Sequence, residues 1–311
     1  MTRVASIGEC MIELKQAGGG LYSRGFGGDT LNTSVYLARL GVAVDYITAL
    51  GDDPLSSEMI AGWEAEGVGT SRVARLAGRL PGIYLIGTDA RGERRFFHWR
   101  ESAAVRSLLD LPETANLLQS LRTYDLVYLS AISLAIYRNE GRARLLAALR
   151  EARESGARIV FDTNFRIRLW PDLDAARAVY AKAFETADIV LASTEDLQML
   201  YPGADADALL ARIPTNEAVL RLAEPVSLVR VAGATHTLKA DAITTPVVDT
   251  TAAGDSFAAA YIAARLAGAE PIDAAGAGDR LAGVVVCHPG AIIPRAAMPA
   301  ASVTTLRKVS G

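Results

Sequence analysis

One stretch near the C-terminus has the residue types and spacing for phosphoryl transfer. Residues 249–255 read Asp-Thr-Thr-Ala-Ala-Gly-Asp and lead into a run with helical spacing. The first turn of a helix presents unpaired N–H groups and the positive end of the dipole, so small side chains there leave room for a phosphate. Asp255 is placed to take a proton from an attacking hydroxyl, although an Asp there could also simply complement the dipole. The small residues are Ala252, Ala253 and Gly254.

A second candidate site begins at the pair Gly27-Gly28. Asp29 follows as an N-cap candidate for a helix that extends to about residue 40 and that Gly41 ends. The two glycines would allow the backbone to approach a ligand closely at this helix start. A Gly-Gly pair before a helix is also typical of a plain turn, so this pattern alone leaves both interpretations open.

Cations and aromatic rings are concentrated in residues 94–100. Segments 81–87 and 93–100 flank the turn-like residues 89–92, which predicts a hairpin. Its second strand carries charge on both faces, as a lid over an anionic ligand would, or as an exposed edge that resists aggregation. Arg166 is a further candidate, because it follows a predicted strand and open α/β sheets bind ligands at the carboxyl ends of their strands.

These motifs together resemble the ribokinase-like (PfkB) carbohydrate kinases. The resemblance covers nearly the whole chain and is greatest, within that family, to bacterial 2-keto-3-deoxygluconate kinases, which phosphorylate the 6-hydroxyl of a sugar acid with ATP and magnesium. It implies in-line transfer, with Asp255 as the base and helix N-terminal amides around Ala253 and Gly254 as the anion hole. The similar stretches are 8–14, 25–36, 80–100, 249–255 and 290–295.

The resemblance also implies an acceptor site. Two of its residues are arginines, which can grip the carboxylate of a sugar acid with two hydrogen bonds. His98 stands where these relatives commonly have a tyrosine, and it could hydrogen-bond a substrate hydroxyl. The implied substrate-binding residues are Gly27, Gly28, Asn32, Tyr84, His98, Arg100 and Arg166.

The nucleotide side departs from the family pattern. Many relatives have an N-x-x-E motif where this chain has residues 193–196, Ser-Thr-Glu-Asp, and a K-x-G loop that we match to residues 230–233, Arg-Val-Ala-Gly. The resemblance implies Asp196 as a magnesium contact. The P-loop pattern G-x-x-x-x-G-K-[ST] does not occur in the sequence. The implied nucleotide-binding residues are Ser193, Arg230, Gly233 and Gly254.

The elements that must position these residues alternate between strands and helices from residue 124 onward. That rhythm predicts a mostly parallel sheet with helical crossovers. With the resemblance, we expect an α/β, three-layer ribokinase-like fold. A single domain would span 1–311, with a small β-sheet lid from about 11–26 and 82–100. The expected strands are 4–7, 11–15, 21–26, 44–50, 81–87, 93–100, 126–129, 158–161, 189–191, 226–231 and 235–238, and the expected helices 29–40, 54–66, 141–154, 173–186, 195–201, 257–266 and 274–286.

Composition excludes several other classes of protein. The 311 residues are 50% hydrophobic and carry a formal net charge of −3, which argues against a general nucleic-acid or membrane-surface binder. Cys10 and Cys287 form no metal or redox motif, and the three histidines form no zinc pattern. We see no signal peptide or membrane-spanning run and expect a cytoplasmic protein. Its partners would be a sugar acid, ATP and a second copy bound through the lid edges.

Two alternatives stay open. The first is a PfkB-type kinase of a neutral sugar such as fructose, against which Arg100 and Arg166 argue. The second is a sugar-acid-binding protein that has lost catalysis, which the altered loop at Arg230 would permit. Asp255 and its glycine–alanine run argue against a pure binder, because binding alone needs no base.

Overall fold

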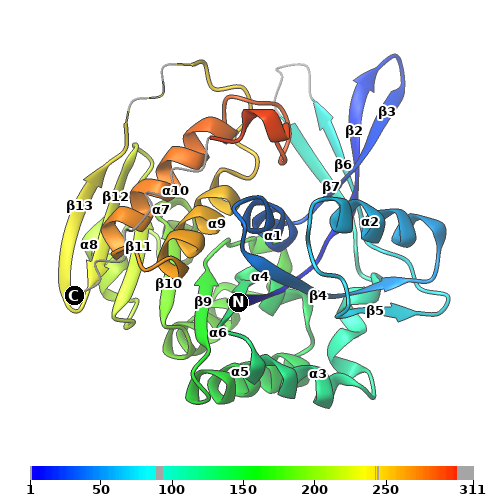
Figure 1. Ribbon diagram of the computed structural model, residues 1–311, viewed down its shortest axis with the longest axis horizontal. Coiled ribbons are helices and arrows are strands. Elements are labelled where there is room, and N and C mark those ends of the chain that lie inside the picture. Colours follow the sequence, from blue (N-terminus) through cyan, green and yellow to red (C-terminus); the bar gives the residue numbers. More distant parts are fainter. Residues whose placement is uncertain (1, 89–93, 242, 244, 300–311) are drawn as a thin grey trace, which may run out of the picture.

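A nine-stranded sheet forms the centre of the molecule (Figure 1). The computed structural model describes residues 2–88, 94–241, 243 and 245–299. The strand order is β13-β12-β11-β10-β9-β8-β1-β4-β5. The strands are β1 (Arg3–Ile7), β4 (Ala43–Gly51), β5 (Val73–Leu76), β8 (Leu126–Ser130), β9 (Arg158–Asp162), β10 (Ile189–Ser193), β11 (Glu217–Arg221), β12 (Val226–Val231) and β13 (Ala234–Lys239).

The sheet is parallel from β5 to β11, and the two pairings at one edge, β11 with β12 and β12 with β13, are antiparallel. Its central strands are short apolar runs, and β8 is buried along its whole length. Such runs are typical of parallel strands with both faces covered. The predicted, mostly parallel sheet is therefore confirmed. The carboxyl ends of β1, β8, β9 and β10 lie at one edge, where a ligand site is expected.

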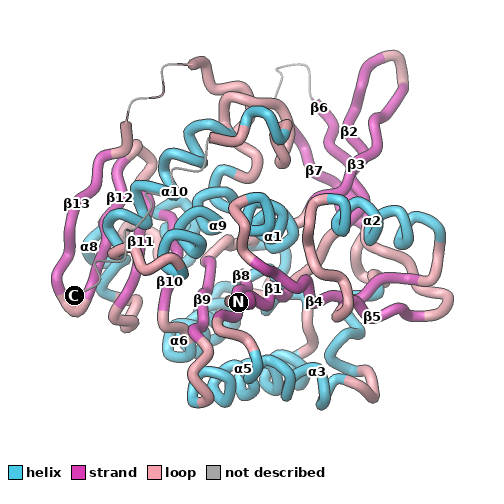
Figure 2. The backbone as a smooth tube through the Cα atoms, in the orientation of Figure 1, coloured by secondary structure: helices cyan, strands magenta, loops and turns pink. Residues whose placement is uncertain are grey.

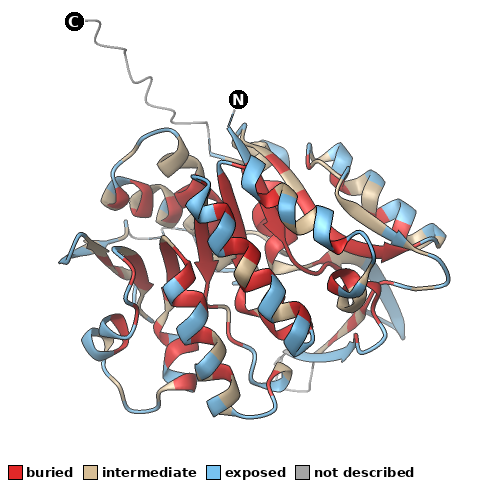
Figure 3. Ribbon diagram, turned by 90° about the horizontal axis from the view of Figure 1, so that it is seen from below, coloured by how far each residue is buried: buried red, intermediate tan, exposed pale blue. Residues whose placement is uncertain are grey.

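Helices cover both faces of the sheet, which gives three layers (Figure 2). Two hydrophobic clusters fill the two interfaces, and buried residues gather in the strands and on the sheet-facing sides of the helices (Figure 3). One layer contains α1 (Asp29–Arg39), α2 (Pro54–Ala65), α9 (Ala253–Leu266) and α10 (Pro271–Val285). The other contains α3 (Thr114–Ser120), α4 (Ala131–Ile136), α5 (Asn139–Glu154), α6 (Leu173–Thr186), α7 (Thr194–Leu200) and α8 (Ala206–Ala211).

A separate four-stranded sheet stands off the core, at the upper right of Figure 1. Its order is β3-β2-β6-β7, so two hairpins from distant parts of the sequence join along β2 and β6. Gly18, Gly19 and Gly20 turn the first hairpin, and all three have positive φ, which glycine adopts without strain. The expected turn at 89–92 lies outside the described residues. The strands are β2 (Met11–Gly18), β3 (Leu21–Gly27), β6 (Ile83–Thr88) and β7 (Arg94–Trp99).

Two local expectations differ from the structure. Asp29 is the first residue of α1 rather than its N-cap; Gly28 holds the cap position, and Asp29 Oδ1 accepts a hydrogen bond from the Thr30 amide instead. The unexpected strand β11 occupies Glu217–Arg221. The expected helix at 54–66 is present as α2, and Asp53 caps it by accepting hydrogen bonds from the amides of Leu55 and Ser56.

Candidate functional site

The start of α9 carries the candidate base and meets the start of α1. Asn32 Nδ2 donates to Asp255 Oδ2 over 2.8 Å, and Thr33 Oγ1 donates to the Asp255 carbonyl over 3.2 Å. Ala252, the N-cap residue, has a φ of 62°, a left-handed conformation that costs a non-glycine residue on the order of 1 kcal/mol or more. The structure thus brings together the predicted base and a predicted acceptor-site residue.

Acidic groups around this junction make Asp255 a stronger base. Burial raises the pKa of Asp255 well above its usual range, and Asp29 and Asp162 raise it further, whereas the Asn32 hydrogen bond and Arg166 lower it. Burial also raises the pKa of Asp162, to about 7. Asn164 links the two neighbouring acids: its Nδ2 donates to Asp29 Oδ2 over 2.7 Å, and its amide to Asp162 Oδ1 over 3.1 Å. A carboxylate with a raised pKa is well matched to general-base catalysis near neutral pH.

We expect Asn32→Ala to shift the acidic side of the pH–activity profile to higher pH. The amide hydrogen bond favours the charged carboxylate, so its loss raises the pKa of Asp255 further, and more of the base is protonated at any acidic pH. The measurement is kcat/KM from about pH 5 to about pH 9. Thr33→Val is the control, because Thr33 contacts only the main chain of Asp255 and should leave the acidic side of the profile in place. An acidic side that stays in place, or moves to lower pH, in Asn32→Ala contradicts this role.

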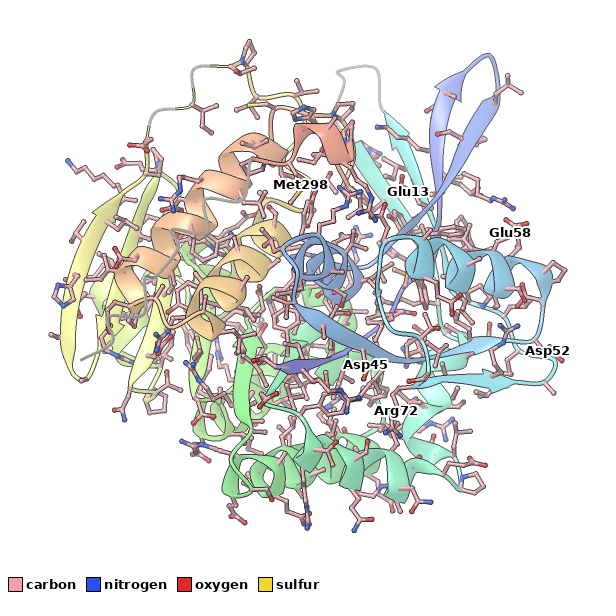
Figure 4. All side chains as sticks on the ribbon, in the orientation of Figure 1. Glu13, Asp45, Asp52, Glu58, Arg72 and Met298 are labelled. Atoms are coloured by element: carbon pink, nitrogen blue, oxygen red, sulfur yellow. The ribbon has the colours of Figure 1, made fainter. Side chains whose placement is uncertain are left out.

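The four-stranded sheet, called the lid below after the role expected for it, packs closely around the two predicted glycines. A Cβ on Gly27 would lie 2.0 Å from Tyr84 Oη, and one on Gly28 would lie 2.1 Å from the Glu9 carbonyl oxygen, so neither position has room for a side chain. Tyr84 Oη donates to Glu13 Oε2 over 2.5 Å. Figure 4 shows Glu13 on the lid. Sequence reasoning missed Glu13, because its partner lies 71 residues away; its pairing opposite Tyr84 in the β2–β6 register places it.

His98 lies on the same face of the lid as Tyr84. The two rings stack with centroids 5.8 Å apart. Burial lowers the pKa of His98, and the nearby Arg100, Arg168 and Arg166 lower it further, because each disfavours a second positive charge. A neutral imidazole can accept a hydrogen bond from a substrate hydroxyl.

The two predicted substrate arginines have different surroundings. Arg100 is buried and hydrogen-bonded through Nη2 to Glu9 Oε2. Arg166 keeps 56% of its side chain exposed, donates to the Phe165 carbonyl over 2.8 Å and lies 3.7 Å from Asp196 Oδ1. Because Arg166 lowers the pKa values of both Asp255 and His98, its charge acts on the base and the lid together.

Ser193 and Asp196 lie at the carboxyl end of β10. Ser193 caps α7 by accepting from the Asp196 amide, and it donates to Asp196 Oδ2 over 2.9 Å. Asp196 also accepts from Thr163 Oγ1 and from the Phe165 amide, each over 3.0 Å. No group of three or more His, Cys, Asp or Glu side chains able to hold a metal occurs among the described residues. Hydrogen-bond donors thus surround the Asp196 carboxylate.

Arg230 and Gly233 do not lie with the other candidates. Strand β12 runs antiparallel to β11, so Arg230 pairs with Ala218, and the turn containing Gly233 lies at the amino end of β11. The Arg230 guanidinium donates to the carbonyls of the preceding segment at Leu210, Ile213 and Thr215. Arg230 therefore holds in place the loop that precedes β11, at the opposite end of the strands from Asp255.

Arg221 lies against the start of α9, and sequence reasoning missed it. It ends β11 beside Ser193 in register. A Cβ on Gly254 would lie 3.1 Å from Arg221 Nη2, and the guanidinium carbon lies 5.1 Å from the centre of the Phe257 ring. Its Nε is buried without a hydrogen-bond partner among the described residues. The local signal for Arg221 was the segment Arg221-Leu222-Ala223. It follows an apolar strand and resembles K-x-G, with Arg in place of Lys and Ala in place of Gly.

The profile described as pfkB family carbohydrate kinase matches residues 1–298. The chain belongs to this family. A "2-dehydro-3-deoxygluconokinase" of Dickeya dadantii is 46% identical over 307 residues, covering 96% of this kinase and 98% of the relative. One of Escherichia coli K12 is 43% identical over 308 residues, covering 96% and 99%.

Solved structures agree on the fold. The aminoimidazole riboside kinase of Salmonella enterica, solved with its riboside and an ATP analogue, superposes with a TM-score of 0.81 at 24% identity and covers 96% of this kinase and 97% of its own chain. The 2-dehydro-3-deoxygluconokinase of Thermotoga maritima gives 0.79 at 22% identity, covering 94% and 96%. The expected ribokinase-like fold is confirmed. No helix of this kinase, within the described residues, is long and apolar enough to span a membrane.

Proposed function

We propose that this kinase transfers the γ-phosphoryl group of ATP to the 6-hydroxyl of 2-keto-3-deoxygluconate, the compound in the names of its two relatives. The observation that carries the proposal is the 46% and 43% identity to these kinases over nearly the whole chain, and the half-exposed Arg166 lies just past the carboxyl end of β9, where a ligand site is expected. Arg100 supplies a second guanidinium on the lid side. A sugar acid brings a carboxylate that these guanidinium groups can neutralise, whereas a neutral hexose brings none.

In the proposed mechanism, Asp255 takes the proton of the attacking hydroxyl while Asn32 holds its carboxylate in place. The hydroxyl oxygen forms a bond to the γ-phosphorus as the bond to the ADP oxygen breaks. Amides around Ala253 and Gly254 donate to the transferring group, and Arg221 lies across the same turn to balance its charge. Asp196 and Ser193, at the carboxyl end of β10, would hold a magnesium ion, which would neutralise phosphate charge when bound.

A coupled ADP-release assay tests this function. 2-keto-3-deoxygluconate and fructose are compared at several concentrations. The proposal predicts turnover of the sugar acid, loss of that turnover in Asp255→Asn, and little turnover of fructose. Preferred turnover of fructose would favour a neutral-sugar kinase instead. If neither sugar turns over but the sugar acid raises the melting temperature, the protein is a binder.

We also propose that the four-stranded sheet is a lid on a single 1–311 domain and pairs two copies into a dimer. Phe97 and Trp99 stand on its outer face, with 62% of Trp99 exposed, in register with Leu85 and Ile83 of the neighbouring strand. An exposed apolar patch on a sheet of this kind is typical of an interface. The free thiols of Cys10 and Cys287 are consistent with a cytoplasmic location, which we propose as well.

Light scattering should therefore give the mass of a dimer for the wild type at micromolar concentration. Trp99→Arg, which places a charge in the apolar patch, should give a monomer with an unchanged circular dichroism spectrum. Leu80→Arg is the control, since Leu80 is similarly exposed but lies outside the four strands of the lid, before β6. A monomeric wild type would contradict the proposed dimer.

A further inference from the structure

The ion pair between Glu9 and Arg100 is buried but incomplete. The two residues are only 2% and 7% exposed, and Arg100 Nη2 donates to Glu9 Oε2. Glu9 Oε1 and Arg100 Nε are also buried, and neither has a hydrogen-bond partner among the described residues. A buried ion pair offsets its desolvation only when the remaining donors and acceptors are satisfied. Burial of this pair therefore costs free energy, and Glu9 Oε1 and Arg100 Nε are left able to form further hydrogen bonds.

Glu9 also occupies the junction between lid and core. The chain crosses between them four times: at Glu9, at Gly28, at Gly82 and at Arg100 (Figure 1). A Cβ on Gly28 would meet the Glu9 carbonyl at 2.1 Å, and one on Gly82 would lie 3.2 Å from Glu9 Oε1. Glu9 thus contacts the other three crossings, and a change in its pairing acts on all of them.

We propose that Glu9 is an internal substitute for the substrate carboxylate: it pairs with Arg100 in the substrate-free enzyme, and the sugar acid displaces it. This inference rests on the proposed function. Glu9 offers Arg100 one hydrogen bond, whereas a substrate carboxylate can offer two parallel ones to the same guanidinium. Displacement is therefore favourable only for a ligand that carries a carboxylate, and Glu9 is a residue that sets specificity.

Two further groups, Arg106 and Tyr137, are close enough to Glu9 to interact electrostatically with it. The pKa of Glu9 is raised by burial and lowered by Arg100 and Arg106, so Arg106 already acts on the carboxylate. Tyr137 has a buried hydroxyl with no partner in the described part of the chain, and the charge of Glu9 raises the pKa of that hydroxyl. These two groups can stabilise Glu9 after it leaves Arg100. Asp29 is the acid that opposes its charge.

The experiment measures KM for 2-keto-3-deoxygluconate in Glu9→Gln, which keeps the size but removes the competing charge. We expect KM for the sugar acid to fall on the order of tenfold, with KM for ATP unchanged. The melting temperature without substrate should fall, because Arg100 loses its counter-charge, and the sugar acid should raise it by more than in the wild type. Glu66→Gln is the matched control: it weakens a partly buried pair with Arg39 in the helical layer and should lower stability without changing KM.

A folded Glu9→Gln variant whose KM rises or does not change overturns the inference, because a merely orienting or structural role predicts one of those results. Glu9→Asp gives a second test should the Gln variant fail to fold: its shorter side chain weakens the pair, so KM should fall by a smaller factor. An unchanged or higher KM in Glu9→Asp overturns the inference too. Failure of the wild type to phosphorylate the sugar acid would instead count against the proposed function.

Discussion

Replacing Asp255 with Asn is expected to lower kcat by about 10²–10⁴-fold, the range for losing a general base. Asn keeps the shape of the side chain but cannot accept the proton of the attacking hydroxyl. The same change should stabilise the fold by roughly 0.5–2 kcal/mol at neutral pH. The sign follows from the raised pKa of Asp255, because a buried carboxylate beside Asp29 and Asp162 is charged at a cost to the native state.

The measurement is single-turnover phosphorylation together with denaturant unfolding. Asp273→Asn is the matched control, since Asp273 is an exposed acid in the first turn of α10 and can only complement a helix dipole. Asp273→Asn should keep its kcat and lose a few tenths of a kcal/mol at most. If Asp255→Asn behaves in the same way, Asp255 is a structural residue and the base lies elsewhere.

Arg166→Ala is expected to reduce kcat/KM for the sugar acid by about 10–150-fold, which corresponds to the ~1.5–3 kcal/mol of a hydrogen bond to a charged group. Arg166 suits this test better than Arg100, because its side chain is half exposed and its buried neighbour Asp196 keeps hydrogen bonds from Thr163 Oγ1, Ser193 Oγ and the Phe165 amide when Arg166 is removed. KM for ATP should stay within about twofold. Arg150→Ala, on the exposed side of α5, controls for the loss of a positive charge. A uniform loss on both substrates would show that Arg166 is not an acceptor-site residue.

Most of the fold could be predicted from the sequence, because its strands are short apolar runs between clear turn and cap signals. Strands β5 and β11 are exceptions. Strand β11 has only three apolar residues between Glu217 and Arg221, too few to distinguish from the surrounding loops. Without β11, the sequence pattern matches K-x-G to Arg230, which the structure places toward the amino end of β11, and Arg221 is overlooked.

Contacts that form only in the folded chain could not be predicted from the sequence either. The apolar run 126–136 contains a strand and a helix, and only the capping box of Ser130 and Ser133 separates them. Glu9 and Glu13 have partners 91 and 71 residues away, across the lid. No local pattern predicts such pairs, because they form only when the two hairpins pair in register and the small sheet lies against the core. The residues of the helix starts were visible in advance, because glycine and small residues before a helix are a local signal.

The hydrogen bond between Asn32 and Asp255 joins residues 223 positions apart. The residues proposed for the acceptor side are therefore synthesised long before the proposed base. The middle of α9, from Ser256 to Ile262, is buried, and the helix packs on α1 and α10, so its docking closes a long loop at an entropic cost. The proposed site is thus complete only after this long-range contact has formed.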